Sequence, residues 1–495
     1  MTTKKIVIVG GGATGWSVAC LLAKNLPREL VKISVVDEQH KDHGQVEFAR
    51  SSIHRFHDLI GLHEKQFMLN TDASFSLGLW CQDAHKDYML GEGAYGAPLS
   101  GIDFQSVYYK SVLLGCSHKL ENYSLNAVAA QLGRFGHPVA DPKSIYSSIQ
   151  YGLHLELNTY ADILKTHALA LGVEVIVSDF SRVNLRRVDV SINDCAIDSI
   201  ELMNGQQLSA DLFIDCTGEH SILLGDVMGG TFVADPLDKI FDSVAIGSRP
   251  LSIDAKPVTQ LINTENGYVR ITPSKYHEYV SYVYSSRFSS DELIKEEMLS
   301  FNVSKVVLSA LDCKKKAQYW VKNCVAIGQA AANFYELFVS PMSLVRSAAV
   351  RLVDLLTDFD DLTFSIDEYN RLTHVESEQL RELVELYFYF GRSSNAVLRE
   401  YFNSNELSAS AQHRLDLFAC TGRQPHPSAQ SFSAFEWASF FVGNHIFPKT
   451  CNLDVDIYDS EKLIQYVESL KTAIYKAAEK MPLHKDYIAR LASNK

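Results

Sequence analysis

The first forty residues carry the pattern that most constrains the fold of this chain. A β-branched run at residues 6–9 leads directly into Gly-Gly-Gly-Ala-Thr-Gly at 10–15, and small and apolar residues then recur at helical spacing over 16–26. A second apolar run at 33–36 ends in Asp37. This order of strand, G-x-G-x-x-G, helix, strand and acid is the fingerprint of a dinucleotide-binding α/β unit.

Each part of the fingerprint has a physical role. Gly10 permits a tight turn, Gly12 lets the backbone approach a pyrophosphate, and Gly15 lets the helix pack on the strand. The N–H donors and positive dipole end of the helix stabilise the phosphates, and Asp37 stands where a carboxylate accepts ribose hydroxyls. The predicted cofactor-binding residues are Gly10, Gly12, Ala13, Thr14, Gly15 and Asp37, with Val183, Gly328, Gln329 and Leu344 later in the chain.

Two later segments repeat the pattern of a strand that runs into a glycine. They are Ala-Asp-Leu-Phe-Ile-Asp-Cys-Thr-Gly at 210–218 and Cys-Val-Ala-Ile-Gly at 324–328. An NAD-dependent dehydrogenase places its nucleotide contacts within one compact stretch, whereas a large flavoprotein returns repeatedly to one sheet. The wide spacing of the three segments therefore favours FAD over NAD.

The fold class that we predict is α/β, with a Rossmann-type FAD-binding domain of the flavoprotein monooxygenase type, a strand-rich insert and a helical C-terminal substrate domain. Residues 1–356 would form the FAD-binding domain, with substrate-facing insertions at about 41–150 and 229–310, and residues 357–495 the helical domain. Amphipathic helices are expected at 378–390 and 460–480. The aromatic stretches at 387–390 and 435–441 fit helix packing better than a pocket for a flat substrate.

Composition excludes several classes of partner. The 495 residues include 46 Lys and Arg against 59 Asp and Glu, a net charge of -13 that disfavours nucleic acid. Nine cysteines without a CxxC pair are typical of reduced cytoplasmic proteins. Apolar runs are too short to span a membrane. His54, His57 and His63 fit a solvated helix face better than a metal site, so no metal is predicted.

The motifs together resemble those of the flavin-dependent tryptophan halogenases over nearly the whole chain. The resemblance rests on residues 9–16, 210–218, 281–292 and 323–328, of which Ser-Tyr-Val-Tyr-Ser-Ser-Arg-Phe-Ser-Ser-Asp-Glu at 281–292 is the most specific. It implies FAD that is reduced by a separate NAD(P)H flavin reductase and a small-molecule or peptide-borne aromatic substrate. Halogenases of this family are often homodimers. They use reduced FAD and oxygen to oxidise a halide to hypohalous acid, which reaches a lysine beside the substrate.

Several functional positions of the family carry unusual residues here. The resemblance places the catalytic lysine on Ser76 and the catalytic glutamate on Phe338, with Glu336 as a substitute two residues earlier. The two positions that bind halide through backbone N–H groups fall on Ser340 and Pro341, and proline has no N–H.

A fourth departure lies in the Gly-Trp-x-Trp-x-Ile-Pro signature of the family. It falls on residues 267–273, where Tyr and Arg270 replace the tryptophans. Arg270 suits an anionic substrate or a reduced flavin anion, and a surface arginine without a role is the alternative.

Three functions therefore stay open. The first is reduced-flavin and oxygen chemistry, such as oxygenation, on an aromatic or indole-like substrate. The second is a genuine halogenase with rearranged residues, and the third is a non-catalytic flavin-binding protein. We expect the first, because the fold and flavin motifs are kept while the halogenation residues are replaced.

Overall fold

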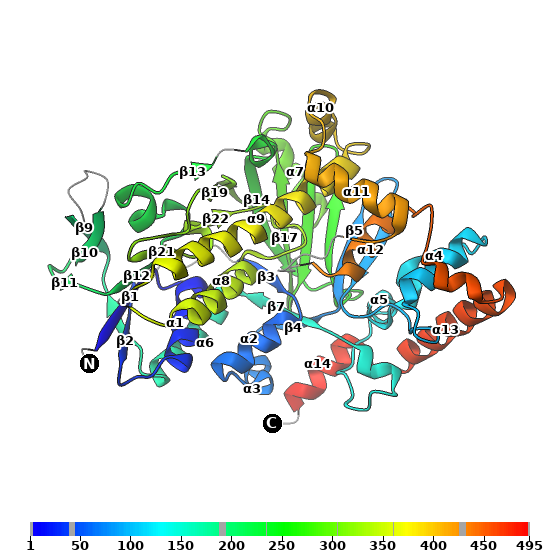
Figure 1. The fold of residues 1–495 in the computed structure, drawn as a ribbon, viewed down its shortest axis with the longest axis horizontal. Coiled ribbons are helices and arrows are strands. Elements are labelled where there is room, and N and C mark those ends of the chain that lie inside the picture. The colour runs from blue at the N-terminus through cyan, green and yellow to red at the C-terminus, as the bar shows by residue number, and fades with distance from the viewer. Residues whose placement is uncertain are drawn as a thin grey trace. The chain divides into compact units, whose positions relative to one another are not determined.

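The computed structural model describes residues 3–38, 45–187, 195–233, 235–303, 305–359, 361–424 and 432–493 (Figure 1). The chain divides into two compact units, each assembled from three separate stretches. Unit 1 comprises Met1–Asp72, Leu155–Lys239 and Leu311–Glu378, and unit 2 comprises Ala73–His154, Ile240–Ala310 and Gln379–Lys495. The assignment of these parts to cofactor and substrate stays a prediction.

Unit 1 contains a six-stranded sheet in the order β20-β21-β12-β1-β2-β8. Its strands are β1 (Lys4–Val9), β2 (Val31–Asp37), β8 (Glu174–Val177), β12 (Leu212–Asp215), β20 (Trp320–Val321) and β21 (Cys324–Ala326). The pairings among β1, β2, β8, β12 and β21 are parallel. The three predicted strand segments thus lie in one sheet, which confirms the predicted α/β class.

Helices cover this sheet because β1 and β12 are buried and apolar. Helix α1 (Ala13–Asn25) follows β1 directly and buries a nearly continuous run of its residues. It contacts α6 (Leu157–Ala170) and α8 (Pro341–Leu355). The smaller elements of unit 1 are α2 (Ser52–Ile60), α3 (Glu64–Leu69), β3 (Val46–Ala49), β9 (Phe180–Arg187), β10 (Cys195–Leu202), β11 (Gln207–Leu208), β13 (Phe232–Val233), β19 (Lys314–Lys316) and β22 (Ala332–Asn333).

Unit 2 is built on a seven-stranded sheet in the order β18-β14-β17-β16-β15-β5-β6. Its strands are β5 (Gly78–Gln82), β6 (Asp87–Gly91), β14 (Ser243–Pro250), β15 (Thr259–Asn263), β16 (Gly267–Pro273), β17 (His277–Tyr284) and β18 (Val307–Ala310). Five of the seven come from residues 229–310, which confirms the predicted strand-rich character of that segment. Strand β4 (Ser74–Ser76) pairs separately with β7 (Gly152–Glu156).

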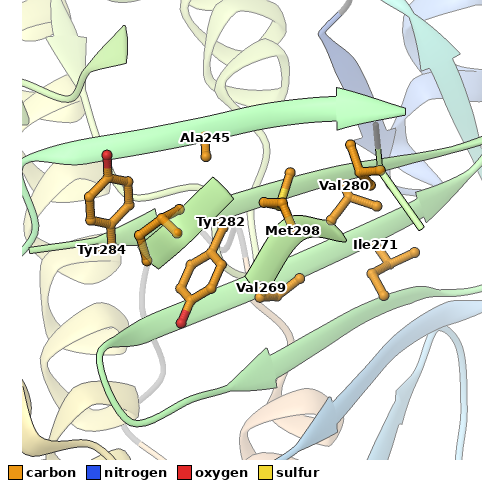
Figure 2. Close-up of a cluster of buried hydrophobic side chains, with 9 residues drawn as sticks. Ala245, Val269, Ile271, Val280, Tyr282, Tyr284 and Met298 are labelled. Atoms are coloured by element: carbon orange, nitrogen blue, oxygen red, sulfur yellow. The ribbon is translucent and has the colours of Figure 1, made fainter. Parts of the chain in front are cut away.

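One face of the seven-stranded sheet carries a core with helix α7 (Asp291–Ser300). Figure 2 shows Val269 and Ile271 of β16 beside Val280 and Tyr282 of β17, with Met298 of α7 against them. Because side chains alternate along a strand, Arg270 points to the opposite face of the sheet. Arg270 is thereby kept out of this core.

The remaining helices belong mostly to the C-terminal part of the chain. They are α4 (Phe104–Leu113), α5 (Leu125–Gln131), α9 (Thr363–Gly391), α10 (Ala396–Ser404), α11 (Ala409–Thr421), α12 (Ala434–Gly443), α13 (Ser460–Lys480) and α14 (His484–Ser493). The bounds of α13 match the predicted helix. Within the described ranges, no helix is both long and apolar enough to cross a membrane.

The two aromatic stretches of these helices pack against each other. The centroid of the Phe390 ring lies 5.7 Å from that of Phe440 and 6.2 Å from that of Phe441. Phe388, Phe440 and Phe441 are fully buried. Their interpretation as helix-packing core is confirmed.

Candidate functional site

A pocket lies at the carboxyl ends of the parallel strands of unit 1. It is lined by residues that directly follow β1, β2, β12 and β21, and it is open to solvent. In open α/β sheets ligands bind outside the carboxyl ends of the strands, where neighbouring loops diverge. Of the predicted cofactor residues, this lining contains Gly10, Gly12, Ala13, Thr14, Asp37, Gly328 and Gln329.

The glycine loop leaves open backbone in this pocket. A Cβ atom on Gly10 would lie 2.2 Å from the Cys216 carbonyl oxygen, and one on Gly15 would lie 1.9 Å from the Gly10 carbonyl oxygen. A Cβ on Gly12 would meet no atom of the described residues within 4 Å. Gly12 is also the N-cap of α1, with no side-chain cap. The exposed N-terminal N–H groups therefore fit a pyrophosphate.

Asp37 lies at the end of β2 with its carboxylate in an ion pair. Its Oδ2 atom accepts a hydrogen bond from Lys165 Nζ at 2.6 Å. Its Oδ1 atom lies where a Cβ on Gly11 would be 2.2 Å away. The carboxylate is thus fixed against the glycine loop, on the wall of the pocket.

The opposite wall carries a buried ion pair. Glu47 Oε1 accepts hydrogen bonds from Arg346 Nη2 at 2.7 Å and from Ser340 Oγ at 2.6 Å. Ser340 is the N-cap of α8 and its Oγ accepts from the Ser343 N–H at 3.2 Å, while Pro341 is the first residue of the helix. At the predicted halide position the Ser340 hydroxyl therefore binds a carboxylate of the protein, and Pro341 offers no N–H.

The charge of the lining is one-sided. The charged side chains among the described lining residues are Asp37, Glu38, Glu47 and Glu336, all acidic. The predicted substitute Glu336 thus lies at the pocket, whereas Phe338 is buried and outside the lining. Two of these carboxylates are paired with cations that lie outside the lining, Asp37 with Lys165 and Glu47 with Arg346.

Three other predicted cofactor residues lie outside the lining. Gly15 packs closely against the Gly10 carbonyl of the glycine loop, where a side chain would not fit. Val183 lies on β9, where it pairs with Ile200 of β10, and Leu344 lies on α8 next to the lining residue Val345. The structure does not bring Val183 or Leu344 to the pocket.

Ser76 and Arg270 belong to unit 2. Ser76 ends β4, opposite Gly152 of β7, and is buried. Arg270 lies in the middle of β16, half-buried, with Leu261 and Ser281 as its cross-strand neighbours.

A buried hydrogen-bond chain holds the strand that carries Ser76. Ser74 Oγ donates to the Pro273 carbonyl at 2.8 Å and contacts His154 Nδ1 at 3.2 Å, so this Nδ1 is the donor of the imidazole. Thr259 Oγ1 then donates to His154 Nε2 at 3.1 Å. Burial lowers the pKa of His154 to about 3, which keeps the ring neutral.

Lys86 is not a structural replacement for a lysine at position 76. It lies at the turn between β5 and β6, next to the Gln82–Asp87 pair, whereas Gly78 begins the hairpin at its other end. Strand β5 spans about 13 Å between these ends. Lys86 Nζ donates to the Phe390 carbonyl at the end of α9, at 2.6 Å.

The solvated face predicted for the three histidines is wrong for His57. Helix α2 buries Ile53, Phe56, His57 and Ile60, and His57 Nε2 lies 3.1 Å from the Tyr160 hydroxyl. Burial lowers the pKa of His57 to about 3. In the described residues, no group of three or more His, Cys, Asp or Glu side chains could hold a metal ion.

Sequence reasoning did not identify Glu47 or Lys165 as part of the site. Glu47 carried a usable signal, because an acid inside the apolar run Val-Glu-Phe-Ala calls for a buried partner. Lys165 carried none, since a lysine on an amphipathic helix is ordinary. The lining also includes Cys216 and Thr217, which follow the predicted strand at 210–215.

Comparison with known proteins gives consistent matches along the chain. The family profile described as tryptophan halogenase matches residues 5–459. Tryptophan 7-halogenase RebH of Lentzea aerocolonigenes is 24% identical over 442 residues, which cover 84% of this chain and 81% of that protein. Two solved structures each match 99% of this chain over 99% of their own length. BrvH, a flavin-dependent halogenase from Brevundimonas sp. BAL3, has a TM-score of 0.91 and 24% sequence identity. Xcc4156, a flavin-dependent halogenase from Xanthomonas campestris, has a TM-score of 0.90 and 25% sequence identity.

Proposed function

The chain belongs to the tryptophan halogenase family, and from this we propose that it is an FAD-dependent oxidoreductase that oxidises an aromatic or indole-like substrate with oxygen. Its FAD would be reduced by a separate NAD(P)H flavin reductase. The proposed reaction is oxygenation or a related oxidation of a small-molecule or peptide-borne aromatic group. Halide would not take part.

The observation that carries this proposal is the contact of Ser340 with Glu47. The hydroxyl at the expected halide position donates to the buried Glu47 carboxylate at 2.6 Å, and Arg346 forms an ion pair with the same carboxylate. A halide beside Ser340 would compete with Glu47 for the Ser340 hydroxyl donor. The absent N–H of Pro341 removes a further donor.

The residues of the unit 1 pocket fit FAD. The open backbone at Gly12 and the N–H groups of Ala13 and Thr14 would hold the pyrophosphate, and Asp37 would accept from a ribose hydroxyl. When bound, FAD would supply the oxidation chemistry with oxygen. Glu336, on the same lining, would accept a proton or orient a polar group.

The residue at position 76 supports the same conclusion. A lysine ammonium at this position activates hypohalous acid, and a serine hydroxyl carries no positive charge with which to do so. Strand β4 is held by neutral hydrogen bonds among Ser74, His154 and Thr259. These side chains therefore add no positive charge near Ser76.

A genuine halogenase is the second candidate, and the position of Glu336 favours it. Glu336 lines the pocket in spite of the Phe338 substitution, so the lining keeps an acid near the expected position. This candidate also needs a lysine that reaches the substrate. Lys86 does not meet this need, because its Nζ atom donates a hydrogen bond to the Phe390 carbonyl at the end of α9.

The test begins with a measurement of FAD binding to the purified chain by flavin fluorescence. The chain is then incubated with FAD, NADH and a flavin reductase, and with tryptophan, indole or an indole-bearing peptide, each with and without bromide. We expect micromolar or tighter FAD binding and a product one oxygen atom heavier in both conditions. A brominated product would establish the halogenase instead, and failure to bind FAD would refute both.

A further inference from the structure

The ion pair between Lys165 and Asp37 suggests a role that neither the fingerprint nor the family resemblance assigns. We propose that Lys165 is a positioning residue for the ribose of the adenosine half of the dinucleotide. It holds one oxygen of Asp37 so that the other faces the ribose hydroxyls. This inference rests on the proposed FAD binding in unit 1.

The geometry separates the two oxygens of the carboxylate. Lys165 Nζ donates to Oδ2 at 2.6 Å, while Oδ1 lies against the Cα of Gly11, a residue of the pocket lining. The Asp37 side chain is 6% exposed and that of Lys165 is 29% exposed. The cation therefore approaches from the solvent side, and Lys165 itself is outside the lining.

Lys165 is held in a defined direction. It lies on α6, which packs on α1, and its Nζ lies 5.6 Å from the ring centroid of Trp16 on α1. An ammonium over an aromatic face is attracted by the ring. Because α1 begins at the glycine loop, the same contacts fix Asp37 relative to the predicted pyrophosphate site.

A charge-assisted hydrogen bond from a cation stabilises a carboxylate that is buried to this degree. Without Lys165, Asp37 would lose the ionic hydrogen bond to its Oδ2 atom and would lie beside the acidic residue Glu38 on the same edge of the pocket. The ionic hydrogen bond therefore keeps a strong acceptor at the point where ribose hydroxyls donate.

The pair also specifies the ligand. Asp37 and Glu38 make this edge a set of acceptors, which suits a ribose with unmodified hydroxyl groups. A 2′-phosphate would meet both carboxylates, and Lys165 is already bonded to one of them. The edge thus selects an adenosine with a free ribose over a 2′-phosphorylated one.

The experiment measures the Kd of the full chain for FAD and for FMN, which lacks the adenosine half. Lys165→Met is expected to weaken FAD binding about 10- to 100-fold, the loss typical of an ionic hydrogen bond, with FMN binding unchanged. Lys165→Arg should restore FAD binding, and Lys4→Met, which removes the partly exposed Lys4–Asp211 pair, should leave it unchanged.

Two further measurements separate positioning from folding. Asp37→Asn combined with Lys165→Met should bind FAD no more weakly than Asp37→Asn alone, because Lys165 acts through Asp37. As a competitor against FAD, ADP should bind at least tenfold more tightly than 2′,5′-ADP.

The inference fails if wild type binds FAD and Lys165→Met binds it equally well, or if FMN binding falls in parallel with FAD binding. It also fails if the two single variants have independent, additive effects, or if 2′,5′-ADP binds as tightly as ADP. A wild-type chain that binds neither FAD nor ADP would refute the proposed function itself.

Discussion

Gly12 offers the sharpest separation between the fold and the predicted cofactor site. The backbone there has φ -77° and ψ -173°, a conformation that every residue adopts, and a Cβ would enter open space on the pocket side. Gly12→Ala should therefore leave the fold intact and occupy the volume in which a pyrophosphate approaches α1. Gly10→Ala should destabilise the fold itself, because its Cβ would lie 2.2 Å from the Cys216 carbonyl oxygen and its backbone has a φ of +112°.

The expected magnitudes follow from these contacts. Alanine at an N-cap costs up to about 1 kcal/mol relative to glycine, and the lower entropy of the unfolded chain offsets about 0.5 kcal/mol of that. Loss of one or two charge-assisted hydrogen bonds from the α1 N-terminus to phosphate would cost about 2–3 kcal/mol of binding, which is about 30- to 150-fold in Kd. Gly10→Ala should cost about 1–3 kcal/mol of folding stability through backbone strain alone.

The assay compares the denaturation midpoint without FAD and the Kd for FAD in the same preparations. Gly136→Ala is the matched control, because its Cβ would meet its nearest described atom at 4.0 Å and it lies outside the pocket lining. We expect Gly12→Ala to shift Kd and Gly136→Ala to shift neither quantity. If Gly12→Ala binds FAD as tightly as wild type, the pyrophosphate is not held at this loop and the reasoning is refuted.

Three other perturbations test the electrostatics of the two units. Burial lowers the pKa of His154 from 6.5 to about 3, so the stability that the neutral ring contributes is complete above pH 6.5 and is lost as the pH falls toward 3. His154→Gln should therefore remove about 1 kcal/mol of the fall in unfolding free energy between pH 7 and 5.5. An unchanged pH dependence of the unfolding free energy would contradict this. Arg346→Met should lower the unfolding free energy by about 3–5 kcal/mol by leaving Glu47 buried without its cation, and adding Glu47→Gln should recover most of the loss in urea denaturation; no recovery would show that packing dominates. Lys86→Met should cost about 1–2 kcal/mol by freeing the Phe390 carbonyl at the end of α9. Thermal melting measures this against the control Lys110→Met, which removes a partly exposed ion pair with Asp456, and equal effects would refute the capping role.

Local sequence patterns predicted the elements that are governed by local physics. The β-branched run before the glycine loop became β1, and the apolar periodicity at 460–480 became α13. The misreading of His57 was also local: it shares the buried face of α2 with Ile53 and Ile60, and the charged neighbours of the histidine masked that periodicity.

The contacts that define the pocket could not be predicted in this way. Glu47 and Ser340 are separated by 293 residues and Asp37 and Lys165 by 128, so no period or spacing links them. Such pairs form only after the tertiary fold brings the end of β2 to α6 and brings β3 to the start of α8. The sequence motif predicted the glycine loop, but only the three-dimensional fold shows that Asp37 pairs with Lys165 and that Glu47 pairs with Ser340.

The assembly of each unit from three separate stretches has a consequence for how the chain is made. β12 pairs with both β1 and β21, so the central strands of unit 1 complete their pairing only when residue 326 has left the ribosome. At about 5–20 residues per second, β1 waits roughly 10–40 seconds for β12, and β12 then waits roughly 5–20 seconds for β21. An early ribosome-bound chain therefore exposes apolar strand edges, and a contiguous N-terminal fragment would share that hazard for as long as it exists.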